Sequence, residues 1–127
     1  MKRFLIAVAV LLALAGERAV LANGQLVLLQ ADPKPDAVLH KTPQVVRLVF
    51  NLELQPGSLA RVEDARGRRV DRGAGGLDPM DKRRRTLLVH LRPLRSGRYT
   101  VLWRAVVHEA GEDHEHVFHG SYRFAIR

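Results

Sequence analysis

The chain has 127 residues, with 27% charged and 46% apolar side chains, no cysteine and a formal net charge of +8. This length and composition fit one globular domain, and they exclude a disulfide scaffold, a cysteine-based metal site and a cysteine nucleophile. Disorder over the whole chain is also excluded, because disordered chains contain too few apolar residues to bury a core.

The first 22 residues have the pattern of a secretory signal peptide. Lys2 and Arg3 precede an unbroken apolar run over residues 4–15, and small residues follow. As a helix, this run would be roughly 18 Å long, which is short for a hydrocarbon core of roughly 30 Å. We therefore predict that residues 1–22 are a signal peptide and that the mature protein works outside the cytoplasm. An uncleaved membrane anchor is the alternative.

Small residues put the predicted cleavage after Ala22, with a second option after Gly24. The mature domain, residues 23–127, keeps 18 basic and 12 acidic residues, a net charge of +6. Arginine-rich turns within residues 66–72 and 82–85 carry much of this excess. They are interpreted either as solvated turns or as surfaces that attract anionic lipid or an acidic partner. Nucleic acid is not an expected partner, because the chain lacks an interleaved aromatic surface on which bases stack.

Short alternating segments separated by turn residues predict β-strands throughout the mature chain. In chain order, the expected strands cover residues 26–31, 44–51, 58–64, 68–71, 85–91, 98–107 and 117–126. A glycine-rich loop interrupts them after the fourth strand, and no ten-residue stretch has an uninterrupted helical period. The prediction is an all-β fold, an antiparallel β-sandwich of about seven strands.

Trp103 is the only tryptophan of the chain. It lies four residues after Tyr99 in an expected strand, so both side chains should project from one face. We expect Trp103 to fill the core between the sheets, because so large a ring dominates burial in a small domain. His90, in a neighbouring strand, is expected on the outer face.

Four of the six histidines cluster around the connection between the last two expected strands: His108, His114, His116 and His119. His114 and His116 are two residues apart, so an extended backbone projects both from one face. His108, at the opposite mouth of the hairpin, is expected to converge with them, whereas His119 should point away. Imidazoles suit copper, zinc or nickel, and a carboxylate such as Asp113 can ligate or orient them. The alternative is a solvated loop that binds no metal.

Five segments, in a fixed order, resemble those of a known family. They are Asp32-Pro33 and residues 43–50, 62–67, 91–104 and 120–124. In these segments the mature chain resembles the CopC-type copper-resistance proteins, exported immunoglobulin-like β-sandwiches that bind copper in the periplasm. The resemblance implies a periplasmic, monomeric copper-binding protein, with a membrane copper-transport protein as its partner.

The resemblance also implies a Cu(II) site, from which this sequence departs. The family uses a histidine at the mature N-terminus, followed by the aspartate and histidine of an Asp-Gly-His segment. The first position falls on Gln25 here and the last on His116, while His114 occupies the aspartate's position, with Asp113 one residue earlier. The loop is also longer than in the family. The methionine-rich Cu(I) site of some relatives is missing, since Met80 is the only methionine after the leader.

The sequence leaves two hypotheses open. In the first, His114 and His116 bind Cu(II), with His108 as third ligand and Asp113 as fourth ligand or as a partner that orients an imidazole. In the second, the sandwich has lost copper and is a protein-interaction module that docks through its arginine-rich turns. An enzyme is not expected, because no nucleophile elbow, paired catalytic carboxylates or cofactor fingerprint is present.

Overall fold

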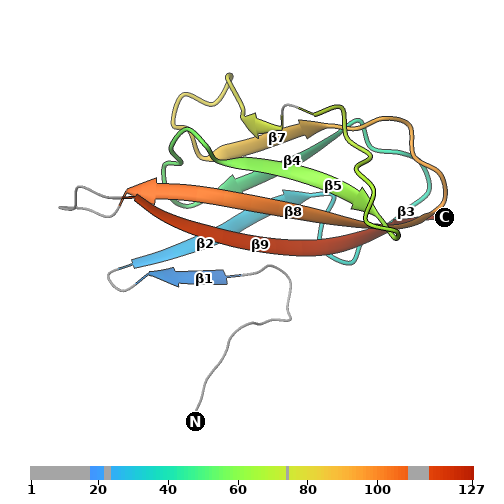
Figure 1. The fold of residues 1–127 in the computed structure, drawn as a ribbon, viewed down its shortest axis with the longest axis horizontal. Helices are drawn as coiled ribbons and strands as arrows, with labels where there is room; N and C mark the ends of the chain where they lie inside the picture. Colours follow the sequence, from blue (N-terminus) through green and yellow to red (C-terminus); the bar gives the residue numbers. More distant parts are fainter. Residues whose placement is uncertain (1–17, 22–23, 74, 109–114) are drawn as a thin grey trace, which may run out of the picture.

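A computed structural model describes residues 18–21, 24–73, 75–108 and 115–127, with side chains from Leu26 onward (Figure 1). In chain order, the strands are β1 (Arg18–Leu21), β2 (Gly24–Asp32), β3 (Val38–Leu39), β4 (Val45–Phe50), β5 (Leu59–Asp64), β6 (Gly76–Leu77), β7 (Thr86–His90), β8 (Gly97–His108) and β9 (Glu115–Ile126). The described residues contain no helix, and therefore none long and apolar enough to cross a membrane.

The strands form two sheets that face each other across one core. One sheet has the order β1-β2-β4-β7-β6 and the other the order β3-β9-β8-β5. The described strand pairs are antiparallel except β3 with β9, which is parallel. The predicted β-sandwich is therefore confirmed, with short additional strands at its edges.

The alternation of apolar and polar residues explains the long strands. In β4, the side chains of Val46, Leu48 and Phe50 are fully buried, and the residues between them are not. In β7, Leu87 and Val89 are equally buried, while His90 is exposed on the outer face as expected. Because side chains alternate between the faces of a strand, these inward rows build one continuous core.

Trp103 lies in that core, as predicted, with 3% of its surface exposed. Its ring meets Phe50 of the facing sheet edge-on, with centroids 5.0 Å apart and an interplanar angle of 69°. Gly120 is its register partner in β9, and a Cβ atom there would lie 2.1 Å from Cζ2 of Trp103. The indole ring therefore covers the space in which a side chain at position 120 would stand.

The edges of the sandwich differ from the predicted strands. The strand expected over residues 68–71 is reduced to two isolated bridges, Glu63 with Arg69 and Asp71 with Leu91. The short strands β1, β3 and β6 were not expected, because two to four residues carry no readable alternation. Of the predicted signal peptide, the structure describes residues 18–21, which form β1 at the edge of β2; the rest of that segment lies outside the described residues.

The long hairpin of β8 and β9 runs the length of the molecule and defines its two ends (Figure 1). One end, which we call the hairpin end, carries the last pair, His108 with Glu115, and the connections from β4 to β5 and from β6 to β7. The other, which we call the arginine end, carries the connections over residues 64–72 and 91–96. The two predicted metal ligands that the structure describes, His108 and His116, and the first arginine-rich turn therefore lie at opposite ends.

Candidate metal centre

The β8–β9 hairpin fixes the direction of each histidine near its tip. Twelve consecutive residue pairs join the two strands, from Gly97 with Ile126 to His108 with Glu115. Residues that face each other in an antiparallel pair project from the same side of the sheet. The face of each histidine therefore follows from the face of its partner.

His116 projects from the inward face of the hairpin. Its register partner is Val107, which is fully buried, and the next inward pair is Ala105 with Phe118. The Nε2 atom of His116 is shielded from solvent. An imidazole therefore continues the core row at the open end of the sandwich, where a ligand atom is screened from water but close to the hairpin tip.

His108 projects from the outer face. Its Nε2 atom lies 3.4 Å from Oε2 of Glu115, its register partner, and both side chains are 47% exposed. His119 lies on the same outer face, opposite Arg104. The expectation that His119 points away from His116 agrees with this register.

Of the four predicted ligands, the structure describes His108 and His116. His108 and His116 leave opposite faces of the sheet, so their side chains do not converge along the described backbone. Asp113 and His114 lie outside the described residues. Within the described ranges, no three histidine, aspartate or glutamate side chains form a group that could hold a metal ion.

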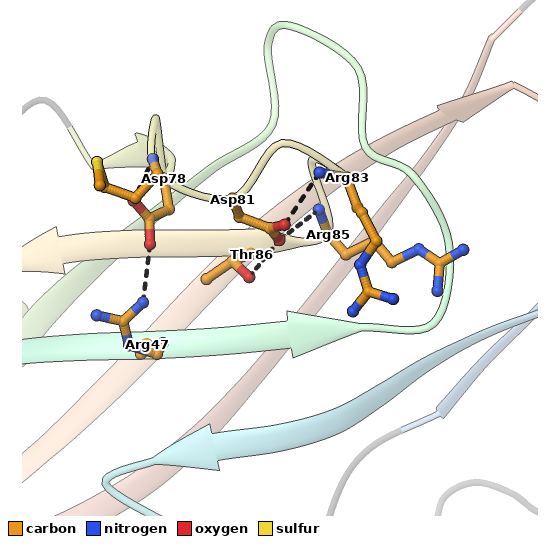
Figure 2. Close-up of polar contacts among 7 residues, drawn as sticks. Arg47, Asp78, Asp81, Arg83, Arg85 and Thr86 are labelled. Carbon is orange, nitrogen blue, oxygen red and sulfur yellow. Dashed lines mark hydrogen bonds and ion pairs between the residues drawn. The ribbon is translucent and has the colours of Figure 1, made fainter.

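A second polar cluster at the hairpin end lies in the turn that leads into β7 (Figure 2). The carboxylate of Asp81 accepts hydrogen bonds from the hydroxyl of Thr86 at 2.6 Å and from the backbone N–H groups of Arg83 and Arg85 at 3.0 Å. The Thr86 hydroxyl contributes most to holding the pKa of Asp81 below its ordinary value of 3.8, and the backbone donors lower it further against the opposing effect of burial. These bonds fold the turn, so the carboxylate has a structural role.

Asp78, in the same turn, is buried and forms an ion pair with Arg47 of β4 at 2.8 Å (Figure 2). Its second oxygen accepts the N–H of Met80. Neither the strand alternation nor the histidine cluster points to these two aspartates. Each aspartate does lie two to four residues before the N–H groups that it binds. That spacing is the signal of an Asx turn and marks both residues as turn formers.

Comparisons with known proteins agree with the fold. Residues 28–127 match the family model described as the CopC domain. The chain is similar to CopC from Methylosinus trichosporium OB3b, with 23% identity and a TM-score of 0.61 over 78% of this chain and 90% of that one.

A second solved structure is PcoC, a methionine-rich copper resistance protein from Escherichia coli. It has 26% identity and a TM-score of 0.60 over 79% of this chain and 96% of that one. Its selenomethionine form gives 24% identity, a TM-score of 0.61 and 98% coverage of that chain. No curated protein matches the chain. About four-fifths of this chain thus corresponds to nearly the whole length of these proteins.

Proposed function

The chain belongs to the CopC domain family, and on that premise we propose that it is an exported protein that binds Cu(II) at the tip of the β8–β9 hairpin. The observation that carries the proposal is His116, an imidazole at the end of the inward row with its Nε2 shielded from solvent. The similar protein PcoC is described as a copper resistance protein, which supports copper as the metal. Imidazole ligands favour Cu(II) over Zn(II) at equal availability.

The proposed ligands have an order of importance. His114 and His116 are the primary pair, because His114 precedes His116 by two residues and an extended backbone projects such residues from the same face. Asp113 is the fourth ligand or the group that orients an imidazole. His108 is the third ligand only for an ion held beyond the last strand pair, because its side chain leaves the outer face beside Glu115.

The proposed role is to buffer copper or deliver it to a membrane copper-transport protein from the periplasm. The protein is proposed to act as a monomer and not as an enzyme. A signal peptide over residues 1–22 would provide the export. The alternative hypothesis, a sandwich that has lost copper and serves as an interaction module, predicts no metal dependence.

Isothermal titration of tag-free residues 25–127 with Cu(II), followed by EPR, tests the proposal. We expect one equivalent of Cu(II), nitrogen hyperfine structure, and a loss of affinity of at least tenfold in His116→Ala. His119→Ala is the matched control, since that imidazole lies on the opposite face of the same strand. Unchanged affinity in a His114→Ala, His116→Ala double variant would contradict the assignment. Weak binding to several sites in the unmodified chain would favour the interaction module.

A further inference from the structure

We propose that the arginine end of the sandwich binds the surface of an anionic phospholipid bilayer through the connections over residues 64–72 and 91–96. This surface lies at the end opposite to the proposed copper site, and its proposed role goes beyond copper binding. The charge, the fixed backbone and the composition of the two connections each support the proposal.

The two connections carry a large excess of positive charge in one place. They contain six exposed arginines and two aspartates and no lysine: Arg66, Arg68, Arg69, Arg72, Arg92 and Arg95, with Asp64 and Asp71. The connections lie against each other, since the N–H of Arg92 donates to the carbonyl of Val70 and Nε of Arg72 donates to the carbonyl of Leu91. The arginines therefore form one surface.

Both aspartates are already paired within this surface. Asp64 binds Arg68 and Asp71 binds Arg69, each at 3.1 Å. Among the described residues, the guanidinium groups of Arg92 and Arg95 make no ion pair. Together with Arg69, they line a cleft of about 190 Å³, and Arg72 and His90 line a second cleft of about 600 Å³ on the other side of Pro93. The unpaired charges of Arg92 and Arg95 thus border the first of these two recesses, which are both open to solvent.

Hydrogen bonds hold the first connection in a fixed conformation. Asp71 is 2% exposed, and its carboxylate accepts the N–H groups of Val62 and Gly73 at 2.8 Å. Burial alone would raise the pKa of Asp71, but these two donors and Arg69 outweigh it and leave the pKa below 3.8. Asp64 accepts the N–H groups of Arg66 and Arg68 in the same way.

The second connection is held from both sides. The hydroxyl of Tyr99 donates to the carbonyl of Arg95 at 2.6 Å, and Thr42 exchanges two hydrogen bonds with the backbone of Leu94 at 3.0 and 3.1 Å. Because the backbone is already fixed, binding costs little backbone conformational entropy there. The surface is thus preorganised for a ligand.

The composition of the surface favours phosphate groups over a protein partner. Guanidinium forms paired hydrogen bonds with phosphate oxygens, which lysine does not, and every cation of the two connections is arginine. The centres of protein interfaces combine arginine with aromatic and other apolar side chains. None of the described large apolar residues that are exposed belongs to the two connections; these residues are Leu29, Val38, Leu59, Met80 and Val117. The phosphate headgroups of a bilayer can pair with these guanidinium groups without any apolar contact.

Sedimentation of residues 25–127 with vesicles tests the proposal. Vesicles of phosphatidylcholine, with and without roughly one-third phosphatidylglycerol, would be used near physiological ionic strength, where the screening length is about 8 Å. We expect binding to the anionic vesicles alone. Arg92→Gln with Arg95→Gln should weaken it on the order of 30-fold, since each arginine near the surface adds a comparable increment.

Lys82→Gln with Arg83→Gln is the matched control, because it removes the same charge from the hairpin end. The twelve residues of β8 separate the two ends by roughly 37 Å, several screening lengths. We expect the control to change binding by less than about threefold. Equal losses in both pairs, equal binding to neutral vesicles, or binding of an acidic peptide such as polyglutamate without vesicle binding would each overturn the proposal. The unfolding midpoint of every variant establishes that it is folded, and neither pair belongs to the proposed copper site.

Discussion

Replacing Gly120 by alanine is the perturbation with the most direct structural consequence. The added Cβ would lie 2.1 Å from Cζ2, 2.3 Å from Cε2 and 2.8 Å from Nε1 of Trp103. Contacts this short do not occur, so either the indole ring or strand β9 has to move. The ring has little room to do so, because Phe50 packs edge-on against it with the centroids 5.0 Å apart.

Overpacking of a close-packed core costs about 1–3 kcal/mol, and a clash with three ring atoms belongs at the upper end of that range. We therefore expect Gly120→Ala to lower the free energy of unfolding by about 2–3 kcal/mol. In a domain of this size, that loss lowers the melting temperature by about 10–20 °C. Gly67→Ala is the comparison: a Cβ added there would meet nothing within 4 Å, and only the left-handed φ of +79° opposes the substitution, which costs about 1–2 kcal/mol.

Urea unfolding followed by circular dichroism measures these differences. A double-variant cycle with Trp103→Phe isolates the clash, because the smaller ring vacates the space that the new methyl group needs. We expect alanine at position 120 to cost at least about 1 kcal/mol less in the phenylalanine background than in the parent. The reasoning is refuted if Gly120→Ala is neutral, or if its cost is the same in both backgrounds.

Three further predictions concern hydrogen bonds made by single side chains. Asp71→Asn should destabilise the fold by about 1–3 kcal/mol, because Arg69 and the buried backbone donors lose a charged acceptor. Since the pKa of Asp71 is lowered on folding, its contribution is present above pH 3.8 and is lost as the pH falls through the folded pKa, so acid titration of stability should bring variant and parent together. Tyr122→Phe should cost about 1–3 kcal/mol by leaving the carbonyl of Pro33, 2.7 Å from the hydroxyl, without its donor. Burial raises the pKa of Tyr122 above 10.0, so the parent should lose stability above pH 10 and the variant less so in the same melts. Asp81→Ala should cost about 1 kcal/mol in urea unfolding, since the turn before β7 loses its acceptor; an unchanged midpoint would contradict the assigned role.

The sequence predicts the long strands because their apolar residues alternate. The inward rows of β4 and β7 are readable from Val46, Leu48, Leu87 and Val89 alone. The strand predicted over residues 68–71 is not regular. In a regular strand a backbone carbonyl would accept the N–H of the neighbouring strand, whereas here the carboxylate of Asp71 accepts an N–H of β5. Side-chain substitution of this kind leaves no periodic signal.

The candidate site is predictable only up to the register of its hairpin. The spacing of His116 and His119 puts them on opposite faces in any extended strand, and the structure agrees. The face of His108 depends on which residue it opposes, and six residues separate His108 from Glu115. A loop longer or shorter by one residue would have paired even with even positions and turned His108 to the face of His116. Loop length is therefore the information that the sequence alone could not interpret.

The buried carboxylate of Asp71 also has a consequence for the behaviour of the protein at high concentration. The outer edge of β5 would offer unpaired backbone groups to other chains, and exposed edges of this kind seed aggregation. Here the carboxylate of Asp71 binds the N–H of Val62, and the carbonyl of Val62 accepts the N–H of Val70. The edge is thus occupied by the chain's own arginine-bearing turn, whose positive charges repel a second copy. An edge that is covered in this way lowers the tendency of the protein to aggregate at high concentration.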